Sequence, residues 1–89
     1  MVCGSNFLNI DPLIGHAVLY DAKFNLLKEL TDENFKNLTY EWRQNSFYNQ
    51  RLNTAVLVSP DGKRLIILEL NTLSISEIHN FDNCHNEPG

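Results

Sequence analysis

The chain carries nearly the same ten-residue segment twice, and this repeat constrains its fold more than any other feature. Residues 21–30 and 61–70 align without a gap as Asp-(Ala/Gly)-Lys-x-x-(Leu/Ile)-(Leu/Ile)-x-Glu-Leu. Each copy follows a short apolar run, at 16–20 and at 55–59. An apolar run, a polar turn and a second apolar run are typical of a β-hairpin. The sequence therefore predicts two hairpins, one in each half of the chain.

The segment between the hairpins predicts the main helix. The helix is expected to start at Thr31 or Asp32, with Thr31 as a suitable N-terminal cap and Asp32 as an acid in the first turn, where the helix dipole favours it. Three apolar residues then recur at helical spacing: Phe35, Leu38 and Trp42. This stripe predicts that Leu38 and Trp42 pack the helix onto the sheet. The polar stretch 45–53 indicates the helix end and a loop.

The C-terminal part allows two interpretations. Leu73 and Ile75 alternate with polar residues, which favours a fifth strand through Ile78. Ser74 and Glu77 instead fit the capping box of a short helix. A strand is the preferred interpretation of residues 73–79, and the short helix stays open.

These elements predict an α+β fold of order β-β-α-β-β-β, with one main helix on one face of a five-stranded, mostly antiparallel sheet. All 89 residues form a single domain, 1–89. Its ordered core is expected at about 7–81, and its flexible ends at 1–6 and 82–89.

The apolar run Leu65–Leu68 creates a packing problem for this sheet. Consecutive strand residues point to opposite faces, so the run places apolar side chains on both. One helix covers only one face. A second chain is therefore expected on the other face, which predicts a dimer or a hetero-complex.

Composition restricts the function further. The net charge is -4 and the basic residues form no cluster, so no nucleic-acid surface is expected. No apolar stretch approaches the roughly 20 residues of a membrane span, and the N-terminus lacks the features of a secretory signal. The cysteines, Cys3 and Cys84, suit a reducing compartment, so the expected location is cytoplasmic.

The order of elements resembles the roadblock/dynein-light-chain-type family, which has a minimal profilin-like fold. Residues 14–21 (IGHAVLYD) and 55–63 (AVLVSPDGK) carry the resemblance, which covers roughly 8–79. The chain departs from the family in lacking clear first and last helices. The resemblance implies a dimerising scaffold that docks small GTPases or assembles motor and lysosomal complexes.

No catalytic signature accompanies this pattern. The sequence has no glycine-rich phosphate loop, nucleophile elbow, paired-carboxylate spacing or HExxH motif. His79, Cys84 and His85 carry metal-ligand atoms but lack tight cysteine pairing, so neither a metal nor a cofactor is predicted. A disulfide between Cys3 and Cys84 is not expected in a cytosolic protein.

Protein binding is the remaining function class. Aromatic residues off the helical stripe and apolar residues of the two-faced run are the interface candidates: Tyr40, Phe47, Tyr48, Ile66 and Leu68. The leading hypothesis is a non-enzymatic scaffold or adaptor subunit, with a small GTPase as the partner that the resemblance suggests. The alternative is an acidic stand-alone inhibitor (a phage counter-defence protein, an immunity protein or an antitoxin) that blocks a partner's basic site.

Overall fold

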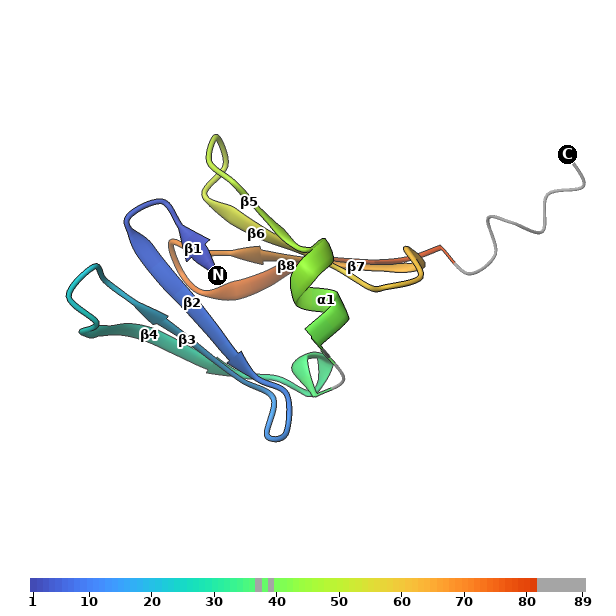
Figure 1. The fold of residues 1–89 in the computed structure, drawn as a ribbon, viewed down its shortest axis with the longest axis horizontal. Helices are drawn as coiled ribbons and strands as arrows, with labels where there is room; N and C mark the ends of the chain where they lie inside the picture. The colour runs from blue at the N-terminus through green and yellow to red at the C-terminus, as the bar shows by residue number, and fades with distance from the viewer. Residues whose placement is uncertain (37, 39, 82–89) are drawn as a thin grey trace, which may run out of the picture.

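The computed structural model describes residues 1–36, 38 and 40–81, with the side chain of Tyr40 outside this part. It contains two antiparallel sheets of four strands each, joined by short helical segments (Figure 1). The N-terminal sheet has the order β1 (Val2–Cys3), β2 (Asn6–Asp11), β3 (His16–Tyr20) and β4 (Leu26–Thr31). The C-terminal sheet has the order β5 (Phe47–Asn49), β6 (Thr54–Val58), β7 (Arg64–Glu69) and β8 (Ser74–Asn80).

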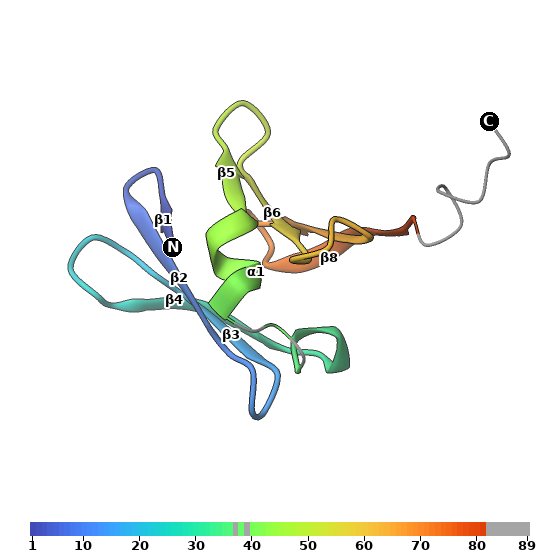
Figure 2. The same cartoon turned by 45° about the vertical axis from the view of Figure 1, so that its right-hand side comes forward.

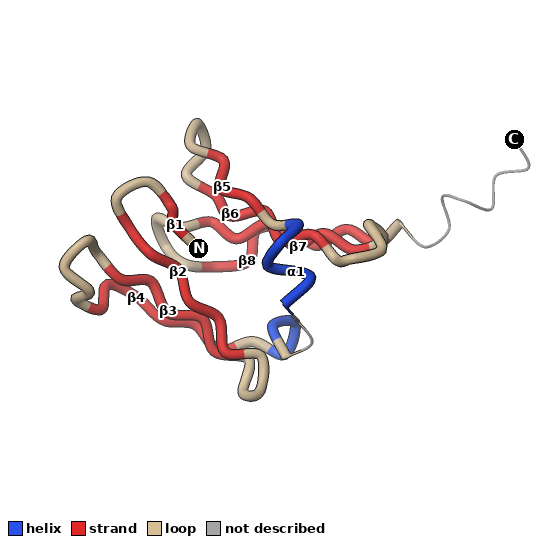
Figure 3. Tube along the Cα trace, in the orientation of Figure 1, coloured by secondary structure: helices blue, strands red, loops and turns tan. Residues whose placement is uncertain are grey.

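The predicted fold class is wrong, because the protein is mostly β (Figure 3). The single five-stranded sheet is replaced by two four-stranded sheets, and the α+β, roadblock-like architecture is not found. Two strands account for most of the difference. Residues 6–11 pair with β3, with Leu8 opposite Leu19, and residues 47–49 pair with β6. Residues 2–3, expected in a flexible end, pair with β2.

Both repeated segments form hairpin turns, as predicted. The first joins β3 to β4 and the second joins β6 to β7. The two copies occupy different places, because the first includes the edge strand β4 whereas β6 and β7 are both central strands of their sheet. Residues 74–80 form a strand, which settles the open choice at 73–79 in favour of the predicted strand.

The expected main helix is divided into two short pieces. Asp32 caps a single 3-10 turn, η1 (Glu33–Phe35), by accepting a hydrogen bond from the backbone N–H of Asn34. A separate helix, α1 (Tyr40–Asn45), follows. The predicted burial of the apolar stripe is nevertheless confirmed, since Phe35, Leu38 and Trp42 are all buried.

The core lies between the two sheets, with α1 in the wedge that they form (Figure 2). Ile66 and Leu68 of β7 are fully buried in this core with Ala17 and Leu19 of the other sheet. Leu65 and Ile67 alternate with them and lie half-buried on the outer face. The second sheet of the same chain therefore covers the face on which a partner was expected.

No helix within the described residues is long and apolar enough to cross a membrane.

Candidate protein-interaction surface

The outer face of the C-terminal sheet carries an apolar patch, which we define as Phe47, Val56, Val58, Leu65 and Ile67. Strand register builds it. Phe47 is opposite Val56, and Val56 is opposite Ile67 on the next strand. Val58 is opposite Leu65 in the adjacent row. Directly opposed residues of antiparallel strands share a face, so the five side chains form one continuous surface.

Phe47 on the edge strand β5 is the most exposed member of the apolar patch. Val56, on a central strand, is 8% exposed, whereas Phe47 is 53% exposed. Val58, Leu65 and Ile67 are half-buried. An exposed aromatic ring beside half-buried aliphatic side chains can supply the apolar centre of a protein contact.

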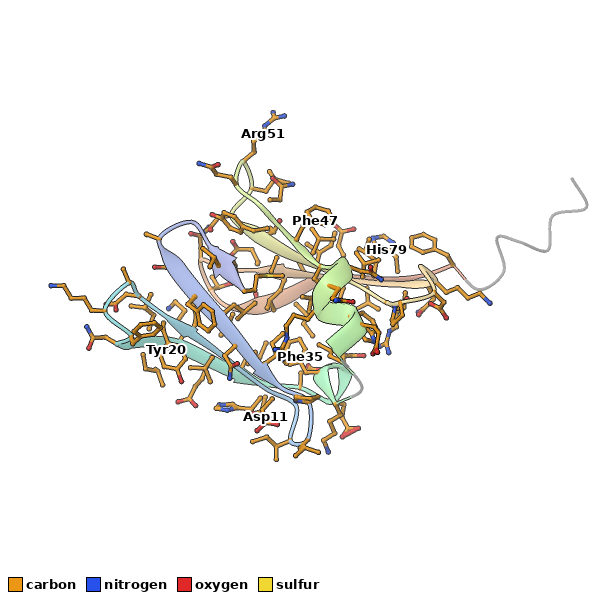
Figure 4. All side chains as sticks on the ribbon, viewed as in Figure 1. Asp11, Tyr20, Phe35, Phe47, Arg51 and His79 are labelled. Carbon is orange, nitrogen blue, oxygen red and sulfur yellow. The ribbon has the colours of Figure 1, made fainter. Side chains whose placement is uncertain are left out.

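A polar rim borders the apolar patch on β8. Glu77 is opposite Ile67 and His79 is opposite Leu65, so both belong to the same outer face. Nε2 of His79 lies 2.7 Å from Oε1 of Glu77. The imidazole also stacks on the Phe81 ring, with centroids 6.0 Å apart. Figure 4 shows Phe47 and His79 on the same side of the sheet.

The predicted interface residues fall in different places. Phe47 lies in the apolar patch. Tyr48 faces the core, and its hydroxyl donates to Oδ1 of Asn53 at 2.8 Å. Ile66 and Leu68 are fully buried, so they form no surface in this fold. Tyr40 begins α1, and its side chain lies outside the described part.

The other apolar patch residues, Val56, Val58, Leu65 and Ile67, were missed by the sequence reasoning. Their signal was the two-residue period within 55–59 and 64–68, which assigns alternate residues to opposite faces. Choosing the outer set requires knowing that a second sheet covers Ile66 and Leu68.

A hollow of about 430 Å³ lies at the end of the β6–β7 hairpin, between Trp42, Pro60 and Arg64. The Arg64 guanidinium donates to Oδ1 of Asn34. Its Nε is buried and makes no hydrogen bond within the described residues. Asp61 also lines the hollow, so its negative charge offsets part of the positive charge of Arg64 and Lys63.

A smaller hollow of about 70 Å³ lies between β2 and α1, lined in part by Leu8, Ile10 and Trp42. It has room for a few water molecules or a small apolar group.

The histidine, cysteine and acidic side chains are the remaining candidates for a chemical site. Within them, no group of three or more histidine, cysteine, aspartate or glutamate side chains is placed to hold a metal ion. Burial raises the pKa of the Cys3 thiol, which lowers its reactivity. Cys84 and His85, named in the metal and disulfide considerations, lie outside the described residues.

Comparison with known protein families, curated proteins and solved structures finds no match to this chain. The function is therefore inferred from the geometry of its surfaces.

Proposed function

We propose that this chain is a non-enzymatic protein-binding scaffold, and that its binding surface is the apolar patch on the outer face of the C-terminal sheet. The observation that carries this proposal is the 53% exposure of Phe47 at the end of a continuous apolar row. Burying an exposed phenylalanine removes more apolar surface from water than burying most other side chains does.

The local structure supports a binding role for Phe47 over a packing role. Its neighbour Tyr48 points to the core, so β5 already has an inward anchor. Phe47 does not belong to the core cluster. The rim residues Glu77 and His79 supply hydrogen-bonding groups beside the apolar centre, which is the usual arrangement of a protein interface.

Affinity purification with a pair of matched variants tests this function. Phe47→Glu places a charge in the apolar patch. Leu52→Glu places the same charge on the loop of the same hairpin, where Leu52 is 66% exposed outside the patch. We expect Phe47→Glu to lose proteins that wild type and Leu52→Glu both retain from a native lysate. Identical protein sets for all three would contradict the proposal, provided that thermal unfolding shows both variants folded.

Salt dependence separates the scaffold from the acidic inhibitor. Binding through the apolar patch should weaken little between low and high ionic strength, because apolar contacts are not screened. An inhibitor that uses the net charge of -4 should lose affinity steeply. The identity of the retained proteins also tests whether a small GTPase is among them.

A further inference from the structure

The longest edge strand in the described part of the chain is β8. β8 (Ser74–Asn80) has seven residues and ends the C-terminal sheet, where β7 is its one paired strand among the described residues. Residues 76–80 are all exposed. Such an edge presents N–H and C=O groups that a further strand can pair with.

The sequence of β8 is self-complementary in one antiparallel register. A two-fold axis normal to the sheet keeps each residue on the same face of the sheet. Because side chains alternate between the faces, opposite residues must then be an even number of positions apart in the sequence. If the axis passes Ile78, Glu77 of each copy lies opposite His79 of the other. Ile78, which is 37% exposed, then meets Ile78 of the other copy.

The contacts at this register are favourable on both faces. On the outer face, each Glu77 carboxylate can accept from the partner copy's His79. The existing bond between Nε2 of His79 and Glu77 is kept when the ring carries a proton on both nitrogens, because Nδ1 then donates to the second carboxylate oxygen of the partner copy's Glu77. On the other face, two exposed isoleucines bury each other. The β-bulge at the Ile67/Leu68 step leaves Ser76 without an opposite residue on β7, so the regular segment of β8 used here starts at Glu77.

The remaining edges are less suited to pairing. β1 and β5 have only two and three residues. β4 has six, but its charged residues Lys28 and Glu29 are adjacent, so the same symmetry can never place one opposite the other. An axis at Lys28 brings two lysines together, and an axis at Glu29 brings two glutamates together. Like charges directly opposite each other are destabilising.

We propose that two copies of this chain form a symmetric dimer through antiparallel pairing of β8 with β8, centred on Ile78. The two C-terminal sheets then form one eight-stranded sheet. Both apolar patches lie on the same face of it, so the dimer binds partners at two places. This last consequence rests on the proposed function, whereas the dimer itself does not.

A pair of variants with altered charges on β8 tests both the choice of edge and the register of pairing. Sedimentation velocity at micromolar protein concentration measures the mass of each particle. We expect wild type to sediment at twice its 10.3 kDa mass. Glu77→Lys places lysine opposite His79, and His79→Glu places glutamate opposite Glu77, so each variant alone should be monomeric. Mixed in equal amounts, the two variants should form a heterodimer. In it the introduced lysine faces the introduced glutamate, and the native His79 of one copy faces the native Glu77 of the other.

Three outcomes would overturn the proposal: a monomeric wild type, single variants that remain dimeric, or a mixture that fails to associate. Lys28→Glu on β4 is the edge control and should leave the wild-type mass unchanged. Circular dichroism checks folding, which should persist because Glu77 and His79 are exposed. Phe47→Glu should also remain dimeric, so loss of partners and loss of the dimer are separate results.

Discussion

The Ser59 hydroxyl donates a hydrogen bond of 2.7 Å to the Asp61 carboxylate, and this pair organises the turn between β6 and β7. The same Asp61 carboxylate accepts from the backbone N–H of Lys63 at 2.9 Å. Ser59 Oγ in turn accepts from the backbone N–H of Arg64. Ser59 is therefore buried at 6% exposure with its polar atoms satisfied.

Gly62→Val should destabilise this turn through backbone strain alone. Gly62 has a φ of +73°, and a Cβ there would meet nothing within 4 Å. The left-handed conformation costs a side chain about 1–2 kcal/mol, so we expect the free energy of unfolding to fall by about that amount. Lys63→Ala should be nearly silent. Urea unfolding measures both variants, and equal stability of Gly62→Val and wild type would contradict the positive φ.

Acid should weaken the fold through three carboxylates that accept backbone N–H bonds. Bonds from Asn25 to Asp21, from Lys63 to Asp61 and from Asn71 to Glu69 lower the pKa of each carboxyl. A folded pKa below the unfolded one stabilises the protein above the unfolded pKa. That contribution is lost as pH falls through the folded pKa.

The ordinary pKa values are 3.8 for aspartate and 4.5 for glutamate, so we expect the contribution of these groups to decline below about pH 4.5. Urea unfolding at a series of pH values measures this decline. Asp61→Asn removes one titrating group and should give a shallower decline. A stability that rises on acidification would show that other groups control the response.

Gly15→Ala should be more damaging than Gly4→Ala, although both glycines have nearly the same positive φ, +67° and +66°. A Cβ on Gly15 would lie 2.5 Å from the backbone oxygen of Asp32, whereas one on Gly4 would lie 3.4 Å from the Tyr48 hydroxyl. The backbone strain is matched, so the clash alone separates the two variants. Thermal unfolding should show the lower melting temperature for Gly15→Ala, and equal values would place the Asp32 carbonyl elsewhere.

The sequence predicted local structure well where a short segment carries its own signal. Pro60-Asp61-Gly62 defines a turn from side-chain chemistry alone, and the hairpin follows. Phe35, Leu38 and Trp42 are buried as their spacing predicts, although the continuous helix is not formed. A 3-10 turn followed by a short helix brings the same residues to the core, so the spacing could not distinguish the two.

Pairings between distant segments were beyond the sequence pattern. Asn6–Asp11 becomes a strand because it pairs with β3, and its own residues, followed by Pro12, favoured an irregular entry. Phe47–Asn49 lies in a polar stretch and gains its strand from β6. The apolar patch was missed for the same reason, since its outer face exists only once a second sheet covers the inner one.

Trp42→Ala should be among the most destabilising single substitutions in this chain. Trp42 is 8% exposed on α1 and packs in the core cluster with residues of both sheets. Removing a buried large aromatic side chain typically costs about 3–5 kcal/mol of unfolding free energy. In so small a domain this loss would leave a large fraction of the molecules unfolded. Phe47→Ala is the matched control, because its ring is 53% exposed and little packing is lost.

Chemical denaturation followed by circular dichroism compares the two aromatic variants, since Trp42 is the one tryptophan in the sequence and fluorescence is lost with it. We expect a large loss of stability for Trp42→Ala and less than about 1 kcal/mol for Phe47→Ala. The reverse order would mean that the Phe47 ring stabilises the fold and that Trp42 lies at a surface. It would contradict the assignment of Phe47 to a binding surface and of Trp42 to the core.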